Sequence, residues 1–220
     1  FTLDVDEIQV AVGRVANVES LNVEAAGVAL KGGRVEVNAR LRTANPRIFA
    51  VGDVCLPYQF THLSGATGGL ALQNALFRGR RKWTDLVIPW CTYTDPEIAH
   101  VGLYERDARA RGIEIETYTR ALEEVDRAIL DGDEDGFVKI HVKKGTDRIL
   151  GATIVARHAG EMISELTLAI NAGIGLKKIA GTIHPYPTQA EAIQQVASAW
   201  YKTQLTPRAK MFLKLLRVLN

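Results

Sequence analysis

The segment Thr43-Ala-Asn-Pro-Arg-Ile-Phe-Ala-Val-Gly-Asp-Val-Cys55 decides the fold, because a turn signal precedes a short apolar run that ends in a carboxylate. Pro46 fixes its own φ angle and biases the preceding residue away from helix, which predicts a turn. The run Ile48–Val51 predicts a buried strand that ends at Gly52 and Asp53. Ligands bind at the carboxyl edge of an α/β sheet, where a glycine lets them approach the backbone. Gly52 and Asp53 are therefore candidate ligand-binding residues.

The composition is that of a globular protein of one or two domains, with 220 residues of which 47% are hydrophobic. The net charge of +2 is close to balance, so the composition does not indicate a nucleic-acid partner. There is no signal peptide and no apolar run that could span a membrane, so we expect a cytoplasmic protein. Cys55 and Cys91 indicate neither a zinc site nor a disulfide framework, and we interpret them as small buried residues, with a catalytic pair as the alternative.

The chain opens at Phe1 without an initiator methionine, and Met162 is its first methionine. We therefore expect a processed or truncated product, in which part of the active site is missing.

Apolar periodicity and turn residues predict the elements before residue 80. A strand, a short helix and a hairpin are expected in that order over residues 7–14, 17–26 and 27–37. A helix rich in glycine and alanine is expected from Thr61 to Phe77, with Thr61 or Ser64 as its N-cap. The positive end of its dipole would then lie close in sequence to Asp53.

The pattern changes after the basic run Arg78–Lys82, which is typical of a solvated linker. Strands are expected at residues 89–94, 114–119, 137–142 and 149–155, and helices at 104–111, 161–172, 176–180 and 190–201. For the last helix, Thr188 is expected as N-cap and Glu191 as its capping-box partner. The acidic loop at 131–136 is interpreted as a surface turn, because the glutamate of a calcium loop is absent from the expected position. Residues 207–220 predict a basic amphipathic helix, packed on its own protein or, as the alternative, attached to a membrane surface.

Four motifs in order resemble the C-terminal half of the FAD-dependent pyridine nucleotide disulfide oxidoreductases, which include lipoamide dehydrogenase, glutathione reductase and mercuric reductase. The resemblance covers essentially residues 4–205, and Tyr186 and the basic tail are most similar to the mercuric-reductase-like branch. The motifs are Ala11–Arg14, Thr43–Asp53, Asp95–Gly102, and His184–Thr188 with Glu191.

The resemblance implies an α/β and α+β fold. Residues 1–80 would be the end of the NAD(P)-binding domain and the returning segment of the FAD-binding domain, and 81–87 a linker. Residues 88–206 would form a dimerisation domain, an antiparallel sheet with helices on one side, followed by the tail helix at 207–220. The implied assembly is a homodimer.

The same resemblance implies FAD and NAD(P)H as cofactors. Gly13 would lie near the nucleotide, and Asp53 would accept a hydrogen bond from the FAD ribityl chain. Thr61 and His62 would bring backbone N–H groups to the flavin pyrimidine edge, where a helix N-terminus stabilises the negative charge of a reduced flavin.

In disulfide-reducing relatives, a His-Pro-Thr unit with a glutamate five positions after the histidine supplies an acid/base to the partner subunit. Here Glu191 matches, but Tyr186 stands at the histidine position and His184 lies two residues earlier. A phenol with an ordinary pKa of about 10 cannot exchange protons near neutral pH as an imidazole does. Turnover of lipoamide or glutathione is therefore not expected. The resemblance to mercuric reductases implies that the tyrosine donates a hydrogen bond or helps to hold a metal ion at the cysteine pair, with a small-molecule or metal-ion acceptor such as Hg(II).

Tyr186, Glu191 and His184 are thus the candidate catalytic residues, and each has an open structural alternative. His184 is also explained as a histidine hydrogen-bonded in a turn, Glu191 as a capping residue, and Tyr186 as a packing aromatic. His62, His100 and His158 lack ligand spacing, so no metal site is expected.

The sequence contains no G-x-G-x-x-G and no closely spaced cysteine pair. We therefore expect the isolated chain to have no reductase activity and to bind FAD weakly or not at all. The leading interpretation is the C-terminal portion of an oxidoreductase that passes a hydride from NAD(P)H to FAD, then electrons to a dithiol and an acceptor. The alternative is a dimerisation or scaffold module without catalysis of its own.

Overall fold

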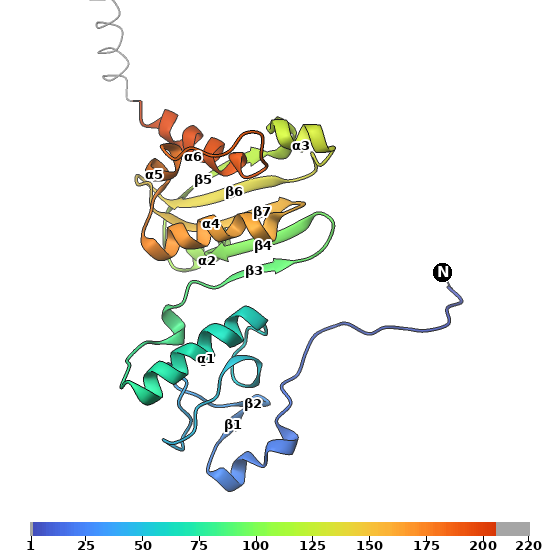
Figure 1. The fold of residues 1–220 in the computed structure, drawn as a ribbon, viewed down its shortest axis with the longest axis vertical. Helices are drawn as coiled ribbons and strands as arrows, with labels where there is room; N and C mark the ends of the chain where they lie inside the picture. Colours follow the sequence, from blue (N-terminus) through green and yellow to red (C-terminus); the bar gives the residue numbers. More distant parts are fainter. Residues whose placement is uncertain (1, 206–220) are drawn as a thin grey trace, which may run out of the picture. The chain divides into compact units, whose positions relative to one another are not determined.

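The computed structural model describes residues 2–205, which form two compact units (Figure 1). The first unit extends to Leu86 and the second begins at Val87. The tail helix expected at 207–220 lies outside the described residues.

The first unit is built from short elements around one long helix. A core of valines, Val18, Val23, Val28 and Val35, holds them together. The antiparallel hairpin of β1 and β2 pairs Leu30 with Val35, which confirms the hairpin expected at 27–37. The elements are the 3-10 helices η1 (Glu19–Leu21) and η2 (Val23–Ala26), strands β1 (Leu30–Lys31) and β2 (Arg34–Val35), η3 (Gly52–Val54), helix α1 (Thr61–Leu76) and η4 (Trp83–Asp85).

The strand expected at residues 7–14 is wrong, because this segment has no regular secondary structure. Its apolar residues are exposed, with exposed fractions of 80% for Ile8, 74% for Val10 and 93% for Val12. A strand needs a neighbour for its backbone N–H and C=O groups, and among residues 2–205 no segment pairs with this one.

The turn expected at Pro46 is present, but the buried strand expected over Ile48–Val51 is wrong. Thr43 N donates to Ile48 O across the turn at 3.1 Å, and Phe49 forms a single isolated bridge with Arg42. The run is half-buried and passes directly into η3. Pairing stops here because Leu41 of the partner segment has a φ angle of +69°, which is not an extended conformation, so the apolar run does not extend a sheet.

Helix α1 confirms the helix expected from Thr61, and its buried residues lie on one face: Leu63, Thr67, Leu70, Ala71 and Asn74. Neither Thr61 nor Ser64 is its N-cap, because Phe60 occupies that position without a side-chain cap hydrogen bond. The Ser64 hydroxyl instead donates to Asp53 Oδ1 at 3.2 Å.

The second unit is organised around a five-stranded antiparallel sheet of order β3-β4-β7-β6-β5. Three strands confirm the predicted runs after residue 113, and the strand expected at 89–94 is present in shortened form. The sequence pattern does not predict β4, because its apolar residues are few and follow a proline turn. The strands are β3 (Pro89–Thr92), β4 (Glu97–Gly102), β5 (Ile115–Ala121), β6 (Phe137–Lys143) and β7 (Ile149–Ala156).

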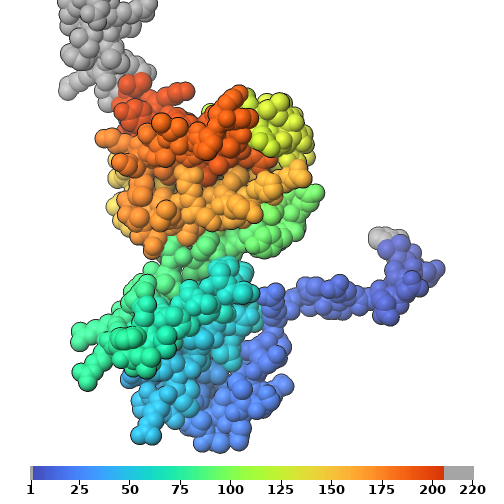
Figure 2. Space-filling model, viewed as in Figure 1, coloured from blue at the N-terminus to red at the C-terminus, as the bar shows by residue number. Residues whose placement is uncertain are grey.

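Helices cover one face of this sheet, and the hydrophobic core of the unit lies between the helices and the strands. Helix α4 packs against β3, β4 and β7, and α6 packs against β5 and β6. In Figure 2 the atoms of α4 and α6, coloured orange to red, fill this side of the unit. The helical elements are α2 (Glu105–Ala110), η5 (Leu122–Glu124), α3 (Asp126–Asp131), α4 (Ala159–Ala172), α5 (Leu176–Ala180) and α6 (Glu191–Thr203). No helix within residues 2–205 is long and apolar enough to cross a membrane.

The predicted N-cap of α6 is wrong. Ala190 occupies the N-cap position without a side-chain cap bond, while the Thr188 hydroxyl donates to Pro185 O at 2.8 Å. Thr188 therefore stabilises the turn before the helix. Glu191 cannot complete a capping box, and its Oε2 atom is buried without a hydrogen-bond partner in the described chain.

Two leucines on α4 test how much the sheet–helix contact stabilises the second unit. Leu166 is fully buried, whereas Leu168 on the same helix is 64% exposed. Leu166→Ala should lower the free energy of unfolding by about 2–5 kcal/mol, because it removes buried methyl groups and leaves a cavity. Leu168→Ala should change it by less than about 0.5 kcal/mol. Urea unfolding followed by circular dichroism measures both, and equal effects would contradict the packing described.

Candidate functional site

Gly52 and Asp53 form a tight turn against α1. Gly52 has a φ angle of +66°, and its N–H donates to the Thr67 hydroxyl at 3.2 Å. A Cβ atom added to Gly52 would lie 2.7 Å from Ser64 Cβ, so only glycine fits. Asp53 accepts the hydrogen bond from Ser64, which fixes the direction of its carboxylate.

A pocket of about 470 Å³ lies beside Asp53. This volume falls within the usual range of small-molecule sites, which begins at about 300 Å³. The Arg14 guanidinium donates to Gln59 O at 2.8 Å and so joins two segments of the pocket wall. The pocket is lined by Arg14, Val15, Ala16, Asn17, Asp53, Val54 and Gln59.

Thr61 and His62 lie in the first turn of α1, whose N-terminus carries neither a side-chain cap nor an acidic residue. The positive end of the helix dipole is therefore not neutralised by the helix itself. The His62 ring stacks on Phe60, with centroids 5.2 Å apart and planes 9° apart. Gly13 has a φ angle of +145° and open space around it in the described residues, one position before Arg14 of the pocket.

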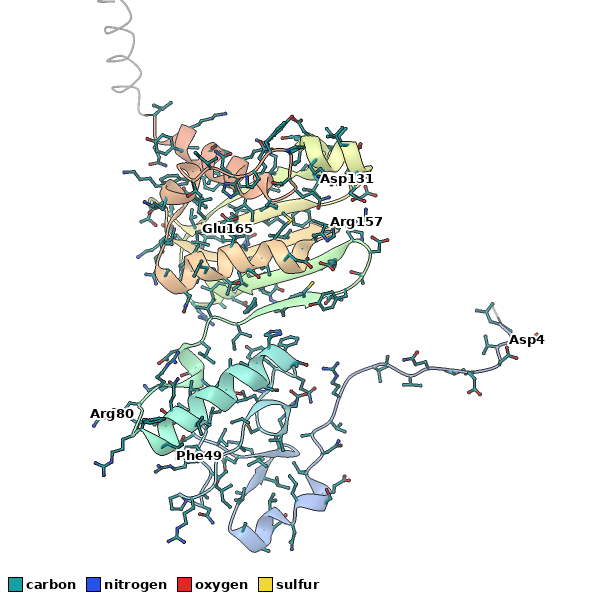
Figure 3. All side chains as sticks on the ribbon, in the orientation of Figure 1. Asp4, Phe49, Arg80, Asp131, Arg157 and Glu165 are labelled. Carbon is teal, nitrogen blue, oxygen red and sulfur yellow. The ribbon has the colours of Figure 1, made fainter. Side chains whose placement is uncertain are left out.

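His184 is held by hydrogen bonds on both ring nitrogens. Nε2 lies 3.1 Å from a carboxylate oxygen of Glu165 on α4, and Nδ1 lies 3.2 Å from Thr182 O. Its side chain is only 8% exposed. Figure 3 labels Glu165 on the helix that covers the sheet. The imidazole is thus fixed inside the second unit.

Tyr186 lies two residues further along and is 69% exposed. Its hydroxyl donates to Asp126 Oδ2 at 2.8 Å, at the first residue of α3. This hydrogen bond and the negative charge of Asp126 raise the pKa of Tyr186, with a smaller contribution from the charge of Glu191. The phenol is therefore protonated at neutral pH and acts as a hydrogen-bond donor.

Asp126 and Glu165 are site residues that sequence reasoning missed. They lie 60 and 19 positions away from the residues they hold. An acidic residue at the start of a helix is ordinarily a dipole partner, and one inside a helix is ordinarily solvated, so neither carries a distinguishing sequence signal.

Both cysteines are free thiols. Burial raises the pKa of Cys55 to about 11. Burial and the neighbouring charge of Glu97 raise the pKa of Cys91. Since the thiolate is the reactive form, neither thiol is activated at neutral pH.

Comparison with known families accounts for both units. Residues 2–76 match the family described as pyridine nucleotide-disulphide oxidoreductase, and residues 88–197 match its dimerisation domain. The chain belongs to the pyridine nucleotide-disulphide oxidoreductases. This confirms the expected family and its mixed fold, and the family uses FAD and NAD(P)H.

Curated relatives carry two different names at similar identity. The chain is 37% identical over 201 residues to a mercuric reductase of Staphylococcus aureus, covering 91% of this chain and 37% of the relative. It is 38% identical over 199 residues to a dihydrolipoyl dehydrogenase of Thermus scotoductus, covering 90% and 43%. The chain thus spans about two-fifths of the length of these relatives.

Solved structures give the same assignment. The HOCl-induced flavoprotein disulfide reductase RclA from Escherichia coli superposes with a TM-score of 0.79 at 29% identity, over 86% of this chain and 44% of that one. LpdA from Mycobacterium tuberculosis gives 0.79 at 27% identity, over 84% and 41%. A Cu(II) complex of RclA also matches, with a TM-score of 0.79.

The hydrogen bond between Tyr186 and Asp126 can be tested by titration. Asp126→Asn should lower the pKa of Tyr186 towards its ordinary value, because the negative charge that disfavours the phenolate is removed. The phenolate absorbance of the variant, with that of Tyr186→Phe subtracted, isolates this residue. Glu123→Gln, which changes an exposed acid nearby in the sequence, should leave the titration unchanged. An unaltered Tyr186 titration in Asp126→Asn would contradict the contact.

Proposed function

We propose that this chain supplies the C-terminal share of a homodimeric flavoprotein that transfers electrons from NAD(P)H through FAD to a metal-ion or small-molecule acceptor. The observation that carries the proposal is the Gly52-Asp53 turn, which sets a fixed carboxylate beside a ligand-sized pocket within a segment that matches the family. The division of the chain at Leu86 supports the proposed linker at 81–87, with cofactor-binding segments before it and a dimerisation domain after it.

The residues present fit one side of a flavin site. The Asp53 carboxylate would accept a hydrogen bond from a ribityl hydroxyl, and Gly52 keeps the backbone close enough for that contact. The uncapped N-terminus of α1, with Thr61 and His62, would face the pyrimidine edge of the flavin. FAD, when bound, accepts the hydride from the nicotinamide. Gly13 precedes the pocket wall and would lie towards the nucleotide.

Tyr186 is the proposed contact to the acceptor. Its phenol is exposed, donates its one O–H to Asp126 and remains protonated at neutral pH, so its oxygen lone pairs would contact the acceptor and the group does not shuttle protons. Glu191, at the position expected to orient an imidazole, has a buried oxygen without a partner in residues 2–205. His184 is positioned by Glu165 and would support the segment that carries Tyr186.

A metal ion is the acceptor class that we favour over a disulfide. Mercuric reductases are among the relatives, and the structural neighbour RclA matches also as a Cu(II) complex. The high pKa of Cys55 and Cys91 implies that a reactive dithiol would come from outside residues 2–205. The second candidate is a dimerisation module without catalysis, favoured by the match of residues 88–197 to a dimerisation domain.

The flavin contact is tested in the whole protein that carries this chain. Asp53→Asn should raise the dissociation constant of FAD about 10-fold, because a charge-assisted hydrogen bond is lost. Asp85→Asn, at an exposed acid of the same unit, is the matched control and should leave the dissociation constant unchanged. Fluorescence titration of the apoprotein with FAD measures both. A colourless, stable dimer that never binds FAD would favour the dimerisation module.

The acceptor is tested by exchanging Tyr186. Tyr186→Phe should lower Hg(II) or Cu(II) turnover about 10-fold, because the hydroxyl is lost, while reduction of FAD by NAD(P)H is unchanged. Tyr186→His should gain activity on a disulfide, because an imidazole exchanges protons near neutral pH beside Glu191. Steady-state assays with each acceptor provide the comparison. Unchanged rates in Tyr186→Phe with every acceptor would mean that Tyr186 is a packing residue.

A further inference from the structure

We propose that a basic pocket in the first unit binds a small phosphate-bearing molecule, with the phosphate on arginine side chains and a hydroxyl group donating to Asn74. The pocket has a volume of about 320 Å³, which is the size of a small ligand site. It shares no lining residue with the pocket beside Asp53 and does not depend on the proposed function. Its polar lining residues are Asn38, Arg40, Arg42, Asn74, Arg78 and Arg80.

Asn74 fixes the two chain segments that carry the arginines. It is 6% exposed on the inner face of α1, and its amide donates to Arg81 O at 2.9 Å and to Arg40 O at 3.4 Å. Gly79 N also donates to Gln73 O, at 3.2 Å. The loop at residues 38–42 and the segment that follows α1 are thereby held together, so the arginines converge from a fixed backbone.

The pocket concentrates positive charge. Four arginines line it and no acidic residue does. Within residues 2–205 none of the four guanidinium groups forms an ion pair with a carboxylate. Guanidinium groups match the oxygens of phosphate with paired N–H donors. An anion with several oxygens would relieve the repulsion between these cations.

Other contacts orient the donors towards a ligand. The Arg42 guanidinium lies 5.4 Å from the centroid of the Phe49 ring, which holds its plane. Asn38 Oδ1 accepts hydrogen bonds from the backbone N–H groups of Arg40 and Arg42, so the remaining side-chain group of Asn38 is a donor. Figure 3 labels Phe49 and also Arg80 on the segment after α1.

One buried hydrogen-bond acceptor in the pocket lining, the side-chain oxygen of Asn74, lacks a donor within the described residues. Asn74 Oδ1 is buried without a partner in the described chain, and a Cβ added to Gly79 would lie 2.7 Å from it. An unsatisfied buried acceptor is costly, and a hydroxyl would satisfy it. Inorganic phosphate and phosphorylated alcohols carry both acceptor oxygens and a hydroxyl donor. Sulfate at neutral pH carries acceptor oxygens but no hydroxyl donor. Comparing it with phosphate therefore separates binding by the arginines from the hydrogen bond to Asn74.

Arg78 occupies a backbone conformation that glycine would adopt more easily, with a φ angle of +53°. A positively charged residue stands there in spite of this strain. Strained residues of this kind cluster at ligand sites. The substitution Arg78→Gly therefore removes a charge from the pocket without harming the fold.

The test is a calorimetric titration of the full chain with inorganic phosphate, glycerol 3-phosphate and sulfate. Both phosphate compounds should bind saturably, with an affinity that falls as KCl is raised, and sulfate should bind several-fold more weakly. Arg78→Gly and Arg80→Gln should each weaken phosphate binding about 10-fold. Arg78→Gly should also keep or raise the Tm, which separates loss of the ligand from loss of the fold.

Arg47→Gln is the matched control, because Arg47 is an exposed arginine of the same unit outside the pocket lining. It should leave phosphate binding unchanged. The proposal is overturned by a lack of saturable phosphate binding, by an equal loss in Arg47→Gln, or by sulfate binding as tightly as phosphate. Binding to vesicles of phosphatidic acid without any response to inorganic phosphate would also overturn it, in favour of a membrane surface.

Discussion

The close contact between α4 and the middle of the antiparallel sheet is the constraint on which the second unit depends. Strand β7 is paired on both sides, and its alternate residues Ala152, Ile154 and Ala156 are fully buried. Two of these three side chains are small, so the helix can approach the sheet closely. Fully buried Leu166 fills the space that remains. This contact fixes the position of α4 on the sheet.

Helix α4 also holds the segment at residues 182–190 in place through a side-chain contact. Glu165 projects from this helix to His184, and Asp126 at the start of α3 binds the hydroxyl of Tyr186. Two anchors on separate elements thus hold a loop whose tyrosine remains exposed. The arrangement suits a side chain that must be presented outward in one orientation, as a contact to an acceptor requires.

In the first unit the corresponding constraint is the contact between the Gly52 turn and α1. The left-handed turn lets the backbone pass Ser64 and aims Asp53 at the pocket. The same helix carries Asn74, about three turns beyond Ser64, where it organises the arginine pocket. One helix therefore positions both groups of polar side chains in this unit, from its inner face.

The sequence by itself determined the family, the hairpin at 27–37, helix α1, and most of the elements after residue 113, because local periodicity and ordered motifs encode them. It wrongly predicted strands at residues 7–14 and 48–51 and the caps of α1 and α6, because strands and caps depend on partners that local pattern does not reveal. Only the tertiary structure shows which side chains hold His184 and Tyr186 in place. Asp126 and Glu165 become partners of Tyr186 and His184 only when the packed sheet brings distant segments together.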